Sequence, residues 1–322
     1  MTGQPPLIAL SNVIIDVVTE KDGTAYPPMA GGAGLYAALA MASWWPQVGL
    51  VAGVGDDFAE ASGGIAAAYS LLPEALILRD QHCIRSELTY HPDGSGRTER
   101  AVYGPDHFGR MAVSPAQIPA SLLPALGSYI FQAGDPIFWQ EVQARRGDLG
   151  TLLWEVDCRM TRDGSPDDFA AVASQADVVS LNLDEARDLL GQGAPNDLFA
   201  RLCTLSPAIV ILRMGDRGAL AGSAAIPPVH IKPPPHQVVD VTGGGNAFSG
   251  GFLAGLCARP GDIEHAGRCA AAAAACAIAQ RGPPAPPDRA LLHQLYATTM
   301  IRSVGSDDHS SFKSQEADVT IR

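Results

Sequence analysis

The sequence predicts an α/β fold in which a mostly parallel sheet is covered by helices on both faces. Two observations lead to this prediction. The 322 residues are 47% hydrophobic and 17% charged, which supplies enough apolar material for a large buried core. Short apolar runs alternate with segments of helical periodicity along most of the chain, as in proteins built from βα units. The length favours either two domains or one large α/β domain with insertions.

Six apolar runs are predicted to be buried strands, and four segments between them are predicted to be helices. The strands are expected at residues 7–13, 48–54, 128–132, 151–156, 178–181 and 208–213. The helices are expected at residues 34–44, 136–145, 165–175 and 184–190. Because ligands of such sheets bind beyond the carboxyl ends of the strands, functional residues are expected in the loops that follow them.

Two segments interrupt this alternation and are predicted to lie outside the main sheet. Residues 17–29 contain a Lys-Asp-Gly turn, and residues 85–103 alternate about a Pro-Asp-Gly-Ser-Gly turn, which is typical of a β-hairpin. We expect insertions near residues 17–29 and 85–110 to form a small β lid over the site. The lid would belong to a single α/β core that spans residues 1–300.

The last third of the chain is rich in small residues. A glycine-rich turn at residues 240–245 precedes one small-residue helix, and a second such helix is expected at residues 267–279. The prolines of residues 283–287 are predicted to end the regular structure. Residues 301–322 are polar and lack periodicity, so we expect a flexible tail there.

Charge and cysteine content argue against several classes of function. Lys and Arg number 22 against 34 Asp and Glu, a net charge of −12 with no basic cluster, which argues against a nucleic-acid partner. The six cysteines form no CxxC pair and are interpreted as reduced core thiols of a cytoplasmic protein. The N-terminus lacks the features of a signal peptide. The uncharged residues 23–55, interrupted by Pro46, are predicted to pack against the sheet rather than to enter a membrane.

The strongest chemical motif is Asp-Val-Thr-Gly-Gly-Gly-Asn at residues 240–246, at a predicted strand-to-helix junction. Three glycines let the backbone approach a ligand closely, and the N–H groups at the start of a helix attract phosphate. The motif therefore predicts a phosphate site. The alternative is a structural glycine turn in which Asn246 caps the helix.

Asn182 and Glu185 follow the predicted strand at 178–181 and lie one helical turn apart. An amide and a carboxylate at the carboxyl end of a strand suit the orientation of Mg²⁺ and its waters beside phosphates. The alternative is a capping box, in which Asn182 caps the helix and Glu185 completes the pair. The residues alone leave both interpretations open.

Weaker signals concern hydroxyl, anionic and dinucleotide ligands. Asp16, at the end of the first strand, could either bind the hydroxyls of a polyol or form a turn. Arg97 could either bind an anionic group or occupy an exposed position in the hairpin. Residues 31–37 contain a GxGxxA fragment, with Asp56 at about the offset of the ribose-binding acid of dinucleotide folds. Two prolines just before the fragment argue against the strand that this fingerprint requires. The eight histidines show no metal-binding spacing.

Taken in order, these motifs resemble those of the PfkB/ribokinase family of sugar and nucleoside kinases, over roughly residues 7–300. The matching segments are residues 11–16, 31–32, 53–58, 176–185, 215–218 and 240–246. The resemblance implies a ribokinase-like three-layer α/β/α fold, with a mostly parallel sheet and a small β lid. The Gly-Gly-Gly-Asn form of the last motif is similar to that of a divergent, largely fungal branch.

The resemblance also implies a reaction and its site. The γ-phosphoryl group of ATP would pass to a hydroxyl of a sugar-like or nucleoside-like small molecule, with Mg²⁺ as a cofactor. The acceptor would be bound by Asp16, Gly31, Gly32, Tyr36 and Arg97, and the nucleotide by Asn182, Glu185, Arg213, Gly215, Asp216, Gly218, Asp240, Thr242 and Cys276. Mg²⁺ would be held through water by Glu185. An anion hole would be formed by Gly243, Gly244 and Gly245, and Asn246 would take the catalytic position. Pairing of the lids of two subunits would also allow a homodimer.

Two residues depart from the family pattern. The family motif ends in an aspartate that removes or orients the acceptor proton, whereas Asn246 has no carboxylate, and general-base help contributes about 10²- to 10⁴-fold. Tyr36 stands where the family usually has an asparagine that binds the acceptor. Three functions therefore stay open: a weakened or altered kinase, a non-kinase enzyme with a repurposed pocket, and a nucleotide- or ligand-binding pseudokinase.

Overall fold

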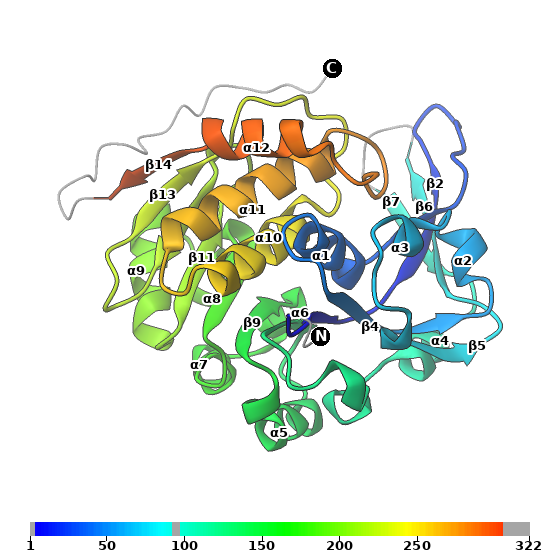
Figure 1. Cartoon of the computed structure of the whole chain (residues 1–322), viewed down its shortest axis with the longest axis horizontal. Helices are drawn as coiled ribbons and strands as arrows, with labels where there is room; N and C mark the ends of the chain where they lie inside the picture. Colours follow the sequence, from blue (N-terminus) through cyan, green and yellow to red (C-terminus); the bar gives the residue numbers. More distant parts are fainter. Residues whose placement is uncertain (1–3, 92–96, 305–322) are drawn as a thin grey trace.

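The computed structural model describes residues 4–91 and 97–304, which form a three-layer α/β/α structure with a small second sheet at one side (Figure 1). Within these residues the main sheet has ten strands, in the order β14-β13-β12-β11-β10-β9-β8-β1-β4-β5. Helices cover both of its faces, so the predicted fold class is confirmed.

Parallel strands form the centre of the main sheet: β1 (Leu7–Leu10), β4 (Val48–Gly55), β5 (Leu76–Asp80), β8 (Gly127–Gln132), β9 (Thr151–Val156), β10 (Val178–Asn182) and β11 (Ile209–Arg213). Antiparallel strands extend it at one edge: β12 (Ala219–Gly222), β13 (Val229–Lys232) and β14 (Met300–Ser303). All six predicted strands are present. The first was predicted too long, because β1 ends at Leu10 and a separate strand begins at Ile14.

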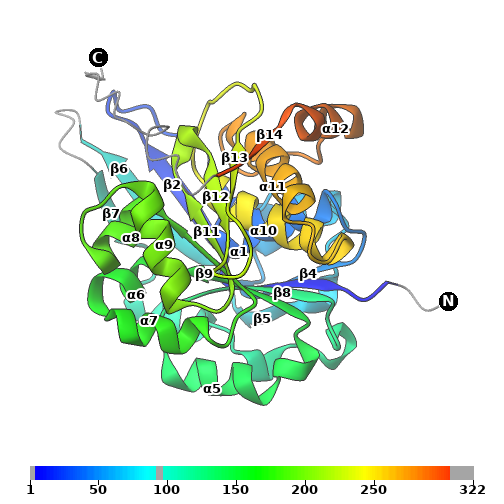
Figure 2. The same cartoon turned by 90° about the vertical axis from the view of Figure 1, so that its left-hand side faces the viewer.

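Two helix layers enclose this sheet (Figure 2). One face carries α1 (Ala33–Ala42), α10 (Gly244–Ala258) and α11 (Ile263–Ile278), with α12 (Arg289–Thr298) packed on α11. The other face carries α5 (Pro136–Ala144), α6 (Cys158–Asp163), α7 (Pro166–Ala173), α8 (Leu183–Leu190) and α9 (Pro195–Leu205). Short helices and 3₁₀ turns complete the chain: α2 (Phe58–Ala61), α3 (Ile65–Ala68), α4 (Pro105–Met111), η1 (Pro73–Ala75), η2 (Pro115–Gln117), η3 (Ala120–Leu122), η4 (Arg146–Asp148) and η5 (Gly215–Arg217).

Successive residues of the central strands point to opposite faces and so build two hydrophobic cores. Leu7 packs in the core beneath α10, together with Phe252, whereas the next residue, Ile8, packs in the core beneath α5, together with Phe138. The four helices predicted between the strands are confirmed within two residues at each end.

Small residues allow α1, α10 and α11 to pack very closely. Gly250 of α10 lies against the backbone of Ala37 in α1, where a Cβ would not fit, and Gly251 lies against the Cys269 carbonyl oxygen of α11. The uncharged residues 23–55 include β3, α1 and all of β4, which pack inside the protein. Within the described ranges, no helix is both long and apolar enough to cross a membrane. All six cysteines are free thiols.

The predicted lid is a separate small sheet, in the order β3-β2-β6-β7. β6 (Ile84–Tyr90) and β7 (Arg97–Ala101) form the predicted hairpin. The other insertion contributes less strand than expected, because β2 (Ile14–Thr19) begins before it and β3 (Met29–Gly31) only starts at its end. β3 pairs antiparallel with β2 in the lid, so the GxGxxA fragment does not follow a strand of the parallel sheet. The dinucleotide interpretation of this fragment is therefore wrong.

The C-terminal boundary of regular structure was predicted too early. The prolines of residues 283–287 are followed by α12, whose Leu292 and Leu295 pack on Ala272 and Ala275 of α11. β14 then pairs with β13, with Ser303 opposite Val229, so residues 301–303 belong to the main sheet rather than to a tail. Residues 305–322 of the expected tail lie outside the described residues.

Candidate active site

A cavity of about 460 Å³ lies where the carboxyl ends of β10 and β11 meet the first turn of α10. Residues predicted for the nucleotide and for the anion hole line it: Asn182, Arg213, Gly215, Asp216 and Gly218 of the first group, and Gly244 and Gly245 of the second. Apolar side chains of Val238, Val241, Phe248 and Ile278 form much of the remaining wall. This is the position in α/β sheets at which ligands bind, at the carboxyl ends of parallel strands.

The glycine motif forms the first turn of α10 at the cavity. Gly243 is the residue before the helix, with a left-handed φ of 76°, and Gly244 is the first helical residue. The first N–H groups of a helix lack partners within the helix and favour an anion. The alternative in which Asn246 caps the helix is wrong, because Asn246 lies inside α10. The junction also differs from the prediction, because residues 233–243 before the helix are irregular rather than a strand.

The ring of Tyr36 packs directly on Gly243. A Cβ at Gly243 would overlap the ring carbons of Tyr36, so glycine is required there by contact as well as by φ. The Tyr36 side chain is buried, and burial raises the pKa of its phenol, with the negative charges of Asp240 and Asp16 raising it further. Tyr36 is therefore a neutral hydrogen-bond donor beside the glycine turn.

Asn246 is held toward the sheet by a residue that the sequence did not single out. Its Nδ2 donates a hydrogen bond to the Tyr129 hydroxyl of β8, with 3.1 Å between nitrogen and oxygen. Ser249, one helical turn further along α10, shares a 2.8 Å hydrogen bond with Ser180 of β10. These contacts fix the first turns of α10 on the sheet.

Arg213 lies at the centre of a buried charged cluster. Its Nη2 forms an ion pair with Glu155 Oε1 of β9 and lies 3.9 Å from Glu185 Oε2 of α8. The guanidinium also reaches the glycine turn, because a Cβ at Gly245 would overlap Arg213 Nη1. Burial raises the pKa of both glutamates, and the charge of Arg213 opposes that rise.

Asn182 and Glu185 form the capping box that was one of their two interpretations. The Glu185 N–H donates to Asn182 Oδ1 at 2.9 Å, and the Asn182 N–H donates to Glu185 Oε2 at 2.7 Å. This role does not remove them from the site, since Asn182 lines the cavity and Glu185 contacts Arg213. The pair therefore starts α8, with Asn182 in the cavity wall and Glu185 connected to that wall only through Arg213.

The predicted acceptor residues lie where the lid meets the core. A Cβ at Gly31 would lie 2.9 Å from Asp16 Oδ2, so the carboxylate rests against the backbone of Gly31. Gly32 is the residue before α1, the helix that carries Tyr36. Arg97 is the first residue of β7, and its side chain lies outside the described part of the structure.

Four predicted nucleotide residues are not part of the cavity wall: Glu185, Asp240, Thr242 and Cys276. Asp240 accepts a hydrogen bond from the Thr242 N–H at 2.9 Å in the turn before α10, and Thr242 is exposed. Cys276 lies on another side of α11, beside Tyr36 in a separate space of about 10 Å³. The assignment of Cys276 to the nucleotide site is corrected, since its neighbours Ala275 and Ile278 line the cavity instead.

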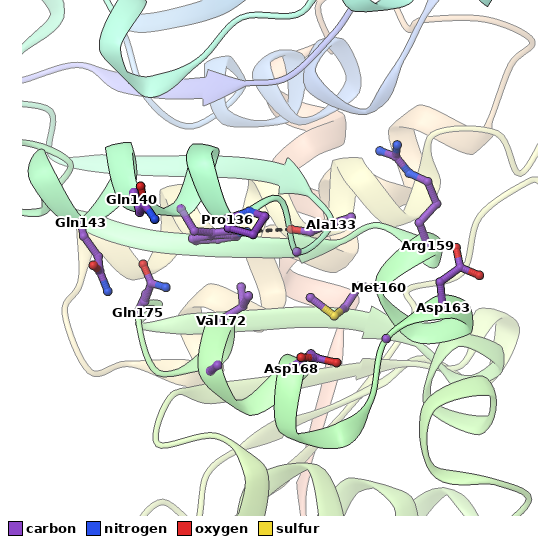
Figure 3. Close-up of a pocket in the computed structure, with 14 residues that line it drawn as sticks. Ala133, Pro136, Gln140, Gln143, Arg159, Met160, Asp163, Asp168, Val172 and Gln175 are labelled. Atoms are coloured by element: carbon purple, nitrogen blue, oxygen red, sulfur yellow. Dashed lines mark hydrogen bonds between the residues drawn. The ribbon is translucent and has the colours of Figure 1, made fainter.

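A second hollow, of about 580 Å³, lies between α5, α6 and α7 on the other face of the sheet (Figure 3). Trp139, Met160 and Val172 line it, and Trp139 Nε1 donates to the Ala133 carbonyl at 2.7 Å. Two of its charged residues are engaged locally: Arg159 pairs with Asp157, and Asp168 completes the capping box of α7. Among the described residues that line this hollow, none was predicted for the site, whereas seven predicted site residues line the first cavity.

Comparison with known proteins places this architecture in a family. A model of the pfkB family carbohydrate kinases matches residues 130–290, which is half of the chain. A cytidine kinase of Thermococcus kodakarensis is 27% identical over 254 residues, which make up 77% of this chain and 87% of that protein.

Solved structures share the fold. The crystal structure of aminoimidazole riboside kinase from Salmonella enterica, complexed with aminoimidazole riboside and an ATP analog, has a TM-score of 0.71 at 23% identity, covering 90% of this chain and 99% of that chain. The Arabidopsis thaliana ribokinase complexed with ribose and ATP has a TM-score of 0.69 at 18% identity, covering 91% and 99%. The fold is therefore ribokinase-like, and with the match over residues 130–290 the chain belongs to the pfkB family of carbohydrate kinases.

Proposed function

We propose that this chain is a kinase that transfers the γ-phosphoryl group of ATP to a hydroxyl of a sugar-like or nucleoside-like small molecule. The observation that carries the proposal is the cavity at the first turn of α10, where Gly244 and Gly245 face the same space as Asn182 and Gly215. Helix N–H groups at such a turn bind phosphate. A cytidine kinase relative and an aminoimidazole riboside kinase neighbour, both named for nucleosides, support this class of acceptor.

The two substrates are proposed to bind on either side of the glycine turn. The nucleotide base lies against the apolar wall that includes Val241 and Ile278, with its phosphates at the start of α10. The acceptor lies beneath the lid, where Asp16 and Gly31 are in contact and Tyr36 donates from its protonated phenol. This arrangement directs an acceptor hydroxyl toward the glycine turn, as in-line transfer requires.

Removal of the acceptor proton is the weak step of the proposed reaction. The amide of Asn246 positions a hydroxyl but takes no proton, and its Nδ2 is already bonded to Tyr129. The carboxylates available near Tyr36 are Asp16 and Asp240, whose charges act on its phenol. Phosphoryl transfer has a loose transition state that depends chiefly on positioning and charge, so a slow reaction is expected.

The residues present fit a Mg²⁺ ion that arrives with the nucleotide rather than one held by the protein alone. Among the described residues, no group of three or more His, Cys, Asp or Glu side chains is arranged to hold a metal ion. Glu185 offers a carboxylate beside Arg213 of the cavity wall, which suits a magnesium bound chiefly by phosphates and water. When bound, Mg²⁺ would neutralise phosphate charge.

A second candidate function is a nucleotide-binding protein without turnover. The hydrogen bond from Asn246 to Tyr129 favours it, because the catalytic position is structurally satisfied without a base. The third alternative, a non-kinase enzyme that uses the glycine turn for another oxyanion, would work without ATP.

An acceptor screen separates these functions. Purified protein is incubated with ATP and Mg²⁺ plus individual pentoses, hexoses and nucleosides, and ADP formation and the phosphorylated product are measured. The kinase proposal predicts acceptor-dependent ADP and product with at least one nucleoside or sugar. Tight nucleotide binding with no product from any acceptor favours the second candidate, and turnover that needs no nucleotide favours the third.

A further inference from the structure

Arg213 brings a positive charge to the glycine turn. It is the last residue of β11, and its Nη1 lies directly against Gly245, where a Cβ would not fit. Of the described residues that line the cavity, Arg213 alone is a lysine or an arginine. The charge therefore lies where the N-terminus of α10 also favours an anion.

Buried carboxylates fix the direction of this guanidinium. Its Nη2 pairs with Glu155, whose side chain is 3% exposed, and lies 3.9 Å from Glu185 Oε2. A guanidinium carries five N–H donors in a rigid planar fork, so pairing through Nη2 leaves the Nη1 edge facing the turn. Nε is buried and has no hydrogen-bond partner within the described residues. The cluster thus holds one edge of the fork in the protein and turns another toward the cavity.

A purely structural ion pair would not need this geometry. Isolated buried pairs contribute little net stability, because desolvation offsets their attraction. Glu155 alone could satisfy Arg213 beneath α10, yet the guanidinium forms part of the cavity wall. The Arg213 side chain is 13% exposed, whereas that of its partner Glu155 is 3% exposed, so the pair is open on the side of Arg213.

We propose that Arg213 binds the terminal phosphate groups of the nucleotide at the glycine turn, and that Glu155 positions it there. The inference rests on the proposed function, since it assumes that the cavity holds a nucleoside triphosphate. Arginine binds phosphate through charge-assisted N–H donors, and the Nη1 donors at Gly245 are the ones that Glu155 leaves open. Arg213 is thus a phosphate-binding residue, whereas Glu155 acts only through Arg213.

Nucleotides that differ in phosphate content test the proposal. Isothermal titration compares adenosine, ADP and a non-hydrolysable ATP analogue on the wild type, Arg213→Met, Arg213→Lys and Glu155→Gln. Arg217→Met is the matched control, because Arg217 is exposed in η5, just after β11, and lies outside the cavity wall. Circular dichroism and thermal melting report whether each variant is folded.

The expected result is a loss of phosphate preference. We expect Arg213→Met to weaken binding of the ATP analogue by about 10- to 100-fold, because hydrogen bonds to charged groups contribute free energies of this size. Adenosine binding should change less than about twofold. Glu155→Gln shows the same selective loss to a smaller degree, and Arg217→Met leaves both affinities unchanged. If Arg213→Met fails to fold, Arg213→Lys, which keeps the charge but not the fork, shows a selective loss of a few-fold.

Other outcomes overturn the inference in distinguishable ways. Equal weakening of adenosine and the ATP analogue means that Arg213 only supports the fold. Unchanged affinities mean that phosphate binds without it. If the wild type itself binds no nucleotide, the proposed function fails together with the role of Arg213. If the wild type binds the ATP analogue and Arg213→Lys binds it equally well and selectively, only the role of Arg213 fails.

Discussion

The side-chain amide of Asn246 donates a hydrogen bond to the hydroxyl of Tyr129, with 3.1 Å between nitrogen and oxygen. Tyr129 is completely buried in β8, and burial raises the pKa of its phenol well above the usual value, so the hydroxyl stays protonated. The position at the start of α10 is therefore ordered without a group that takes up a proton at neutral pH. In the proposed kinase, this position would therefore keep its geometry while lacking a general base.

Asn246→Asp is expected to raise the rate of phosphoryl transfer to an acceptor found in the screen by about 10²-fold or more. The reason is that a carboxylate accepts the hydroxyl proton, while Tyr129 can donate to it and keep it in place. The rate is measured by coupled ADP release. Tyr129→Phe serves as the control, because it frees the amide without adding a base and should not accelerate the reaction. An unchanged or slower Asn246→Asp variant would contradict the assigned catalytic position.

Gly243→Ala is expected to destabilise the protein more than Gly64→Ala. Both glycines precede a helix with similar left-handed φ, 76° and 71°, so backbone strain of about 1–2 kcal/mol applies to both. Only Gly243 is covered, by the ring of Tyr36, whereas the Cβ position of Gly64 is open. Overpacking adds about 1–3 kcal/mol at Gly243. Urea unfolding measures the difference, and equal losses would show that the Tyr36 contact has no energetic weight.

The buried thiols predict that stability falls in alkaline solution. Burial raises the pKa of Cys203, Cys257 and Cys276 to about 11. In the unfolded chain these thiols ionise at lower pH, so the stabilisation is complete below about pH 8.5 and is lost as pH rises toward 11. Urea unfolding under reducing conditions at pH 8 and pH 10 should give a lower free energy of unfolding at pH 10. A higher value at pH 10 would reverse the sign and refute the burial argument.

Arg281 is expected to hold the loop between β2 and β3 on the core. Its Nη1 donates to Glu20 Oε1 at 2.7 Å, and its guanidinium carbon lies 4.0 Å from the centre of the Tyr26 ring. These partly exposed contacts contribute about 1 kcal/mol together, so Arg281→Met should speed cleavage after the exposed Lys21 by a few-fold. A lysine-specific protease measures this, with Arg289→Met, an exposed arginine of α12, as the control. Equal rates in the two variants would mean that Arg281 does not restrain the loop.

The central sheet could be predicted from sequence because its strands are short, continuous apolar runs, as buried parallel strands are. The strands at the edges were harder. β12 and β14 have four residues each, and β3 has three, so a periodicity analysis has too few positions to work with. α12 follows a run of prolines, and its two buried leucines do not stand out without α11 beside them.

The site residues likewise divide into those that belong to local sequence motifs and those that only the fold brings together. The glycine turn and the Asn182–Glu185 pair are local motifs, and the turn and Asn182 line the cavity, whereas Glu185 contacts only Arg213 of its wall. Helical spacing indicates that Cys276 lies on another face of α11, since Ala271, Ala275 and Ile278, spaced by four and three residues, form the face that lines the cavity.

Glu155 was missed although one signal was present, a carboxylate within the apolar strand at residues 151–156. Its partner Arg213 is 58 residues away, and only the order β9-β10-β11 brings the two together. Tyr129 gave no signal, because a tyrosine in a buried strand is ordinarily a core residue.

Titration of the purified protein with a non-hydrolysable ATP analogue, with and without Mg²⁺, tests the central claim that the cavity at the first turn of α10 binds a nucleotide. Gly245→Val is the companion variant, because its side chain would occupy the space that Arg213 Nη1 and the turn share. We expect saturable binding that strengthens with Mg²⁺ and is lost in Gly245→Val. Absence of binding by the folded wild type at millimolar nucleotide would contradict it.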